Sequence, residues 1–132
     1  VLYETLENFK HHTCDIVAKS QECIDWINDY YGKKNVQFYN MDSLEFLTKM
    51  KDERKQFDLL WIDSHHTYEF LLSELTIAGK LGAPYIMIDD IWGDRGLQIA
   101  VFQFMNENKG YKIHSYRNVR ASVGSIMILE GC

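Results

Sequence analysis

Three aspartates occupy positions at which they could bind a cation or a positively charged ligand. Asp63 follows the apolar run Phe57–Ile62, and Asp89 and Asp90 follow the apolar run Tyr85–Ile88. Neither run alternates between apolar and polar residues, which indicates short strands buried on both faces of a parallel sheet. Carboxylates that meet at one sheet edge repel one another unless a cation or a ligand amine relieves the repulsion. Their oxygens suit magnesium or calcium better than zinc.

A helix between the two runs would bring these aspartates together. Apolar residues recur there at helical spacing, at Tyr68, Leu71, Leu72, Leu75 and Ala78. Gly79 and Gly82 then end the helix, and Pro84 disfavours a restart. A strand–helix–strand unit of this length forms a right-handed crossover, so its two strands run parallel. The aspartates therefore arrive at the carboxyl edge of the sheet, where open α/β sheets bind ligands.

The rest of the chain continues the alternation of strands and helices. Strands are expected at Cys14–Ala18, Asn35–Met41, Tyr111–Tyr116 and Ser122–Leu129, and helices at Tyr3–His12, Gln21–Tyr31, Ser43–Lys51 and around Leu97–Met105. The short connection between the last two strands implies an antiparallel hairpin. The sequence therefore predicts one α/β domain, residues 1–132, folded as a three-layer sandwich around a mostly parallel sheet.

Charge and cysteine content exclude several classes of protein. The chain has 132 residues and a net charge of −5, which disfavours nucleic acid or an anionic membrane as its main partner. No apolar run approaches the roughly 20 residues that span a bilayer. The three cysteines, Cys14, Cys23 and Cys132, lack the spacing of metal ligands. We expect a cytoplasmic protein whose cysteines are reduced.

Several of these segments resemble the motifs of one enzyme family. The segment FDLLWIDSHHTYEFLL, a glycine turn and YIMIDD are similar to the later motifs of class I S-adenosylmethionine-dependent methyltransferases, in particular the small O-methyltransferases. The segment VQFYNMDSLEFL resembles the family's third strand and the acidic turn that borders the adenine ring. The terminal hairpin resembles its reversed seventh strand. The resemblance implies a Rossmann-like methyltransferase fold and S-adenosylmethionine as the cofactor.

The resemblance also implies roles for individual residues. His66 stands where the family carries a catalytic base, and with Asp63 it would remove the proton from a substrate hydroxyl. Asp63, Asp89 and Asp90 match the three acidic positions of the metal-dependent members, with Asp90 in place of the usual asparagine. The resemblance further implies cofactor contacts at Ser20, Asp42, Ser43 and Asp63.

These residues also have structural interpretations, which the sequence leaves open. Asp63 is a suitable cap for the following helix, and His66 could bond to the backbone at the start of that helix. Asp89 and Asp90 could form a solvated turn. Asp42 could cap a helix and also accept a hydrogen bond from the adenine amine.

Two features of the family do not occur in these 132 residues. The first strand and its glycine-rich loop are missing, and the acidic position after the second strand falls near Ser20, with Glu22 the nearest carboxylate. We expect a fragment of a longer protein, which a start at Val1 favours. The other options are direct pairing of the second and fourth strands, or a homodimer that completes the sheet. The chain alone should bind S-adenosylmethionine weakly or not at all.

The function that the sequence favours is methyl transfer from S-adenosylmethionine to an oxygen of a small molecule. The hydroxyl proton would be removed either by His66 or through polarisation by a metal ion at Asp63, Asp89 and Asp90. The alternative is a non-catalytic remnant of a methyltransferase that acts as a binding or oligomerisation module, which the missing glycine loop favours. A receiver-like domain would need an acidic pair after its first strand and a lysine late in the sheet, and neither is evident.

Overall fold

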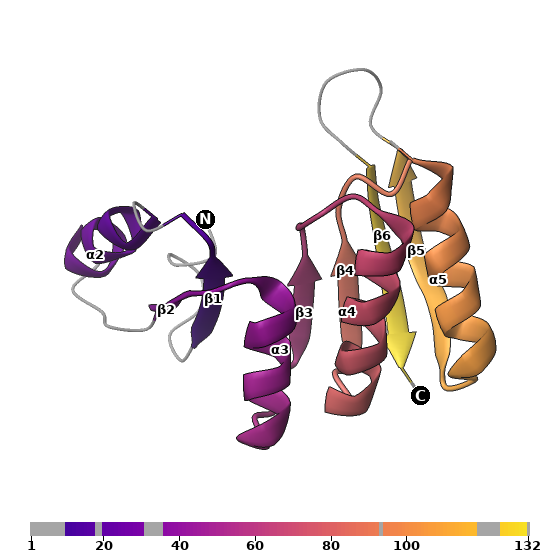
Figure 1. Ribbon diagram of the computed structural model, residues 1–132, viewed down its shortest axis with the longest axis horizontal. Coiled ribbons are helices and arrows are strands. Elements are labelled where there is room, and N and C mark those ends of the chain that lie inside the picture. Colours follow the sequence, from indigo (N-terminus) through magenta and orange to yellow (C-terminus); the bar gives the residue numbers. More distant parts are fainter. Residues whose placement is uncertain (1–9, 18–19, 31–35, 93, 119–124, 132) are drawn as a thin grey trace. The chain divides into compact units, whose positions relative to one another are not determined.

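The computed structural model describes residues 10–17, 20–30, 36–92, 94–118 and 125–131 (Figure 1). The chain divides into two compact units, Val1–Phe46 and Leu47–Cys132, called here the N-terminal unit and the C-terminal unit. None of the described helices is long and apolar enough to cross a membrane.

The N-terminal unit contains a two-stranded parallel sheet. Strand β1 (His11–Asp15) pairs residue by residue with β2 (Val36–Asn40). Helix α2 (Ser20–Tyr30) lies between them in the chain and is tied to β2 through Asn28. The Asn28 side-chain amide donates to the carbonyl of Val36 at 3.1 Å, and the Val36 amide donates back to Asn28 Oδ1 at 3.3 Å. These two bonds fix the end of the helix against the start of the strand.

Helix α3 (Ser43–Asp52) contains the boundary between the two units. It begins where it does because Asp42 caps it: Asp42 Oδ1 accepts from the backbone amide of Glu45 at 2.9 Å. The Asp42 carbonyl accepts the first helical bond, from the amide of Phe46, also at 2.9 Å. The helix follows the predicted Ser43–Lys51 closely, because both its cap and its apolar spacing are local features of the sequence.

The C-terminal unit contains a four-stranded mixed sheet in the order β3-β4-β6-β5 (Figure 1). Strands β3 (Leu59–Ile62) and β4 (Tyr85–Ile88) are parallel, as the crossover predicted. Strands β5 (Tyr111–Asn118) and β6 (Ser125–Gly131) form an antiparallel hairpin, and β6 pairs antiparallel with β4. The combination of parallel and antiparallel pairing confirms the predicted α/β fold class.

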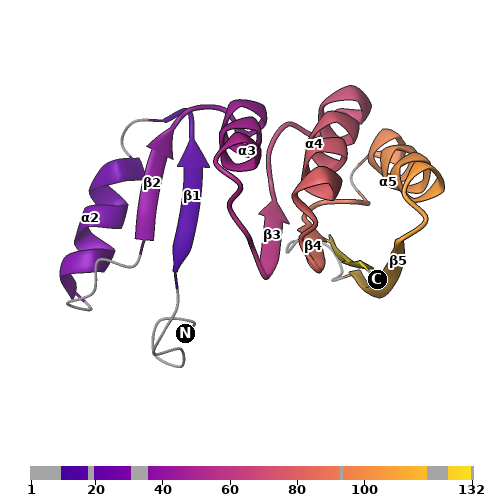
Figure 2. The same ribbon diagram turned by 90° about the horizontal axis from the view of Figure 1, so that it is seen from below.

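Two helices, α4 (Tyr68–Leu81) and α5 (Arg95–Glu107), cover one face of this sheet (Figure 2). They contact each other closely at Gly79 of α4, where a Cβ atom would lie only 2.9 Å from the ring of Phe104. Between the helices and the sheet lies an apolar core of fully buried side chains, which includes Leu75, Ile86, Ile88, Leu97, Val101, Phe104 and Leu129.

The ends of α4 follow the local signals in the sequence. Thr67 caps the helix, and its hydroxyl accepts from the amide of Phe70 at 3.4 Å. Gly82 ends the helix in the left-handed conformation, with φ of 69°, and its amide donates to the carbonyl of Gly79. Glycine adopts this φ without steric cost, which explains why the predicted end was correct.

The prediction that β3 and β4 are buried on both faces is wrong. Their side chains alternate between buried and accessible: Ile62 and Ile86 are buried, whereas Leu59 and Trp61 are 47% and 58% exposed. The reason is that α4 and α5 both lie on the same face. Within the described part of the C-terminal unit, no helix covers the opposite face.

The predicted strand Cys14–Ala18 is displaced in the structure. Strand β1 starts three residues earlier, at His11, and ends at Asp15, in register with β2. His11 and His12 are therefore in a strand and not at the end of a helix, as the prediction Tyr3–His12 had placed them. Residues 1–9 of that prediction lie outside the described part of the chain.

Candidate functional site

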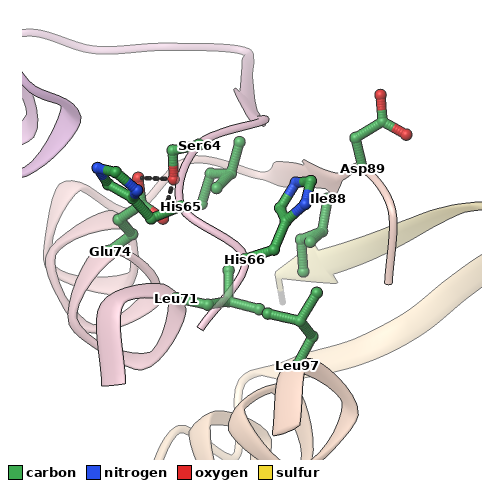
Figure 3. A pocket seen from close by; sticks show the side chains of 9 residues that line it. Ser64, His65, His66, Leu71, Glu74, Ile88, Asp89 and Leu97 are labelled. Atoms are coloured by element: carbon green, nitrogen blue, oxygen red, sulfur yellow. Dashed lines mark hydrogen bonds between the residues drawn. The ribbon is translucent and has the colours of Figure 1, made fainter. Parts of the chain in front are cut away.

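A small pocket opens at the carboxyl ends of β3 and β4 in the C-terminal unit (Figure 3). Its apolar part is made by side chains of the buried core, and its polar part comes from the loop after β3, from α4 and from the end of β4. The lining residues are Ile62, Ser64, His65, His66, Leu71, Glu74, Ile88, Asp89 and Leu97. The pocket therefore lies at the sheet edge where the sequence placed the function.

The two predicted catalytic residues, Asp63 and His66, lie beside each other, and His66 lines this pocket. The distance between His66 Nε2 and Asp63 Oδ1 is 3.7 Å, and both side chains are substantially exposed. Both belong to the loop between β3 and α4, and they are three residues apart. An exposed pair of this kind contributes about 1 kcal/mol or less to stability, so its position at the pocket is the more informative observation.

Beneath this loop a buried carboxyl group makes a hydrogen bond that sequence analysis missed. Ser64 Oγ lies 2.7 Å from both Oε1 and Oε2 of Glu74 and donates to that carboxylate. Glu74 is only 1% exposed. The helical spacing of Glu74 in the sequence could have indicated that it is buried, because Glu74 falls on the same face of α4 as Leu71 and Ala78. A carboxylate within an apolar helical stripe needs a partner inside the fold.

The Asp89 carboxylate after β4 is held by the backbone of the next residue. Asp89 Oδ1 accepts from the amide of Asp90 at 2.9 Å, and the Asp89 amide donates to the carbonyl of Ile62 at 3.0 Å. Asp90 adopts a left-handed conformation with φ of 50°, uncommon for a residue other than glycine. Figure 3 shows the Asp89 carboxyl group directed away from the Ser64–Glu74 side of the pocket.

The predicted magnesium or calcium site does not form from Asp63, Asp89 and Asp90. Among the residues that the structure describes, no group of three or more histidine, cysteine, aspartate or glutamate side chains could hold a metal ion. The physical reason is local: Asp89 is bound to the neighbouring amide, and Asp63 faces His66. Sharing one sheet edge is therefore not sufficient to make three carboxylates converge.

In the N-terminal unit, strand β1 ends at a carboxylate, Asp15. The resemblance counts β1 as the second strand of the family, because the first strand is missing from this chain. The hydroxyl of Ser20 donates to Asp15 Oδ2 at 2.7 Å, and the amide of Val17 donates to Oδ1 at 2.9 Å. These two hydrogen bonds hold the pKa of the Asp15 carboxyl below its usual value. The sequence prediction placed this position near Ser20, with Glu22 as the nearest carboxylate, because it set the strand three residues too late.

The other expected cofactor residues of this unit are Asp42 and Ser43. Asp42 caps α3, as its interpretation as a helix cap predicted. Only Asp42 Oδ1 takes part in the capping bond, so Oδ2 is outside it. The hydroxyl oxygen of Ser43 is buried and, within the described part of the chain, has no hydrogen-bond partner. Buried hydroxyls are normally paired, so Ser43 is a polar group that a ligand could satisfy.

No protein-family model matches the sequence, and no match was found among curated proteins. Solved structures do match. A ribosomal protein L11 methylase from Lactobacillus delbrueckii subsp. bulgaricus matches with a TM-score of 0.61 and 15% identity, over 92% of this chain and 57% of its own. An rRNA methylase from Streptococcus thermophilus matches with a TM-score of 0.64 and 13% identity, over 92% of this chain and 73% of its own. The chain has a Rossmann-like methyltransferase fold.

A third match of this fold, TYW2 from M. jannaschii in complex with AdoMet, has a TM-score of 0.57 and 13% identity and covers 99% of this chain and 62% of its own. At such identities the matches show the fold alone. The chain spans between 57% and 73% of the length of these three structures. Two of them are named as methylases of a ribosomal protein and of rRNA, so the finer resemblance to small O-methyltransferases stays a prediction.

Proposed function

We propose that this chain belongs to an S-adenosylmethionine-dependent methyltransferase that acts on an oxygen of a small molecule. The observation that carries the proposal is that His66 lines the pocket on the carboxyl edge of a methyltransferase-type sheet, with the Asp63 carboxylate 3.7 Å from its Nε2. An imidazole at this edge is suited to accept a proton from a substrate hydroxyl.

The N-terminal unit supplies groups suited to the nucleoside part of the cofactor. Asp15 is a carboxylate at the end of the second family strand, where the resemblance places the acceptor for the ribose hydroxyls. Asp42 and Ser43 stand at the acidic turn that the resemblance assigns to the adenine ring. The buried hydroxyl of Ser43 gives this assignment structural support, because a bound polar group would satisfy it.

The chemistry divides between the cofactor and the protein. When bound, S-adenosylmethionine supplies a methyl group on a sulfonium sulfur: the substrate oxygen bonds to that carbon while the sulfur–carbon bond breaks and sulfur keeps the electron pair. His66 accepts the proton that the hydroxyl loses, through Nδ1, because Nε2 is the nitrogen nearest Asp63. The Asp63 carboxylate then lies beside the imidazolium and offsets its charge.

Charge supports a small-molecule acceptor over nucleic acid. The chain carries a net charge of −5, and two of the residues that line the pocket, Glu74 and Asp89, are acidic. Phosphate backbones are bound by clusters of lysine and arginine, and none of the residues that line the pocket is either. A small hydroxyl compound needs no such cluster.

The test is transfer of a labelled methyl group to a panel of small phenols and alcohols, with RNA and protein acceptors in parallel. Because this chain should bind S-adenosylmethionine weakly, the cofactor is supplied well above its dissociation constant. We expect label in the small hydroxyl compounds, and a loss of about 10²-fold or more in His66→Gln, the range of general base catalysis. His114→Gln is the matched control, because His114 lies on β5 beside Glu130, 3.5 Å away. Equal activity of His66→Gln, or label only in RNA or protein, would contradict the proposal.

A further inference from the structure

A buried carboxyl group and a serine connect helix α4 to the loop that carries His66. Ser64 Oγ donates to the Glu74 carboxylate, with both oxygens at 2.7 Å. Figure 3 shows the two side chains joined at the pocket lining, together with His65 and His66. Glu74 comes from the buried face of α4 and is only 1% exposed. The bond therefore reaches from the helical core to the loop that holds the candidate base.

Core packing alone gives no reason for a carboxyl group at this position. Burial of a carboxylate is costly unless it is hydrogen-bonded, and an apolar side chain of similar volume is often at least as stabilising. Leu71 and Leu75, the neighbours of Glu74 on this face, are apolar and buried. What the carboxylate adds is a directional, charge-assisted hydrogen bond to Ser64.

This bond is one of several that fix the loop on both sides of His66. Thr67 caps α4 through the amide of Phe70, and the Thr67 amide donates to the carbonyl of His65 at 2.9 Å. The ring of His65 lies edge-on against the ring of Phe70, with centroids 4.7 Å apart. Ser64 fixes the other end of the loop, so the backbone of His66 is held between two anchors.

We propose that Ser64 and Glu74 are positioning residues: they hold the loop formed by residues 63–67 so that His66 stands at the pocket with Asp63 beside it. Neither acts as the base, and both act through the geometry of the loop. The role assigned to His66 rests on the proposed function. The ordering of the loop by Ser64 and Glu74 does not, and it can be measured separately.

The first measurement is amide hydrogen exchange of the loop by NMR, with the Thr67 amide as the reporter. Ser64→Ala should speed its exchange about tenfold or more, because local opening no longer has to break the Ser64–Glu74 bond. Ser64→Thr keeps a hydroxyl at this position, so exchange of the Thr67 amide should stay as slow as in the parent protein. Ser73→Ala is the matched control, because the Ser73 hydroxyl donates to the carbonyl of Glu69 on the exposed side of α4.

A second variant separates positioning from simple stability. Glu74→Met keeps most of the buried volume and removes the charge, so we expect an unchanged or higher melting midpoint. Exchange at Thr67 should nevertheless rise as it does in Ser64→Ala, and the double variant should be no faster than either single variant. Unchanged exchange at Thr67 in both single variants would overturn the proposal.

Methyl-transfer kinetics then connect the loop to the site. Ser64→Ala should lower kcat on the order of tenfold or more, because a displaced base costs rate, while KM for S-adenosylmethionine changes little. If the parent protein transfers no methyl group at S-adenosylmethionine concentrations well above its dissociation constant, the proposed function fails, and the exchange data still decide whether the loop is held. A loop released in Ser64→Ala with kcat unchanged would overturn the positioning role.

Discussion

The two faces of the four-stranded sheet in the C-terminal unit have different surroundings. The face toward α4 and α5 is closed, and its side chains at Leu60, Ile62 and Ile86 are at most 6% exposed. On the opposite face Trp61 is 58% exposed and Tyr85 is 38% exposed. The residues of the two faces are close neighbours along the same strands, so their sequence type alone does not distinguish them.

This difference shows that an unbroken apolar run indicates that both faces of a strand are apolar, but does not indicate whether another element packs against each face. Strands β3 and β4 carry apolar side chains on both faces, and in the described C-terminal unit only one face has helices. An open apolar face is a common place for a further segment or a second copy to bind. The expected homodimer stays a prediction, and the open face is where it can be tested.

The largest effect is expected on the closed face. Ile86 is fully buried between β3 and β6, so Ile86→Ala should lower the free energy of unfolding by about 2–5 kcal/mol through lost burial and a cavity. Chemical denaturation measures this value. A cost below about 1 kcal/mol would mean that the covered face is less tightly packed than described.

A smaller loss is expected where the two covering helices meet. A Cβ atom at Gly79 would lie 2.9 Å from Cε2 of Phe104, and this ring is fully buried and cannot easily move. Gly79→Ala should cost about 1–3 kcal/mol in overpacking, offset by up to about 1 kcal/mol of helix propensity. Thermal melting tests this, with Gly110→Ala as a control because a Cβ there meets no atom within 4 Å. A stabilised Gly79→Ala protein would contradict the close contact of the helices.

On the open face, Trp61→Ser should change the free energy of unfolding by less than about 1 kcal/mol, as for other surface substitutions. The measurement is denaturation at several protein concentrations, with sedimentation of the parent protein and the variant. A large loss that depends on concentration would show that a second copy covers this face. A large loss without that dependence would indicate cover by residues outside the described part of the chain.

The smallest effect is expected at the carboxyl edge, where the two faces meet. Magnesium or calcium should leave the melting midpoint of the parent protein unchanged, because Asp63, Asp89 and Asp90 do not form a metal cluster. A metal site would raise the free energy of unfolding by about 2.7 kcal/mol at an ion concentration about 100 times its dissociation constant. A rise in midpoint that Asp63→Asn and Asp89→Asn abolish, and that Asp42→Asn keeps, would restore the metal site.

What could be predicted from the sequence was set by local signals. Strand β4 has the predicted bounds, Tyr85–Ile88, and α4 ends at Gly82, because turn residues and helical spacing act within a few positions. Strand β1 was displaced, because its position is decided by pairing with β2, more than 20 residues away in the chain. That displacement hid Asp15, which lies at the strand end where the resemblance calls for a carboxylate.

The site itself was predictable only in outline. The sequence placed Asp63 and His66 together because three residues separate them in one loop. It could not show that Asp89 bonds to the next amide, or that Asp90 takes a left-handed conformation, since both depend on the course of the backbone after β4. Glu74 was missed because an acidic residue on a helix is usually solvated, although its spacing from Leu71 and Ala78 places it on the buried face of α4.

The measurement that tests the central claim most directly is an NMR titration of this chain with S-adenosylhomocysteine, the product form of the cofactor. We expect amide shifts at residues 64–66 and at Asp89, which follow β3 and β4 and line the pocket. Because no glycine-rich loop occurs in these residues, binding should be weak, with a dissociation constant on the order of 1 mM. Shifts confined to other surfaces, or none at several times that concentration, would contradict a cofactor site at this sheet edge.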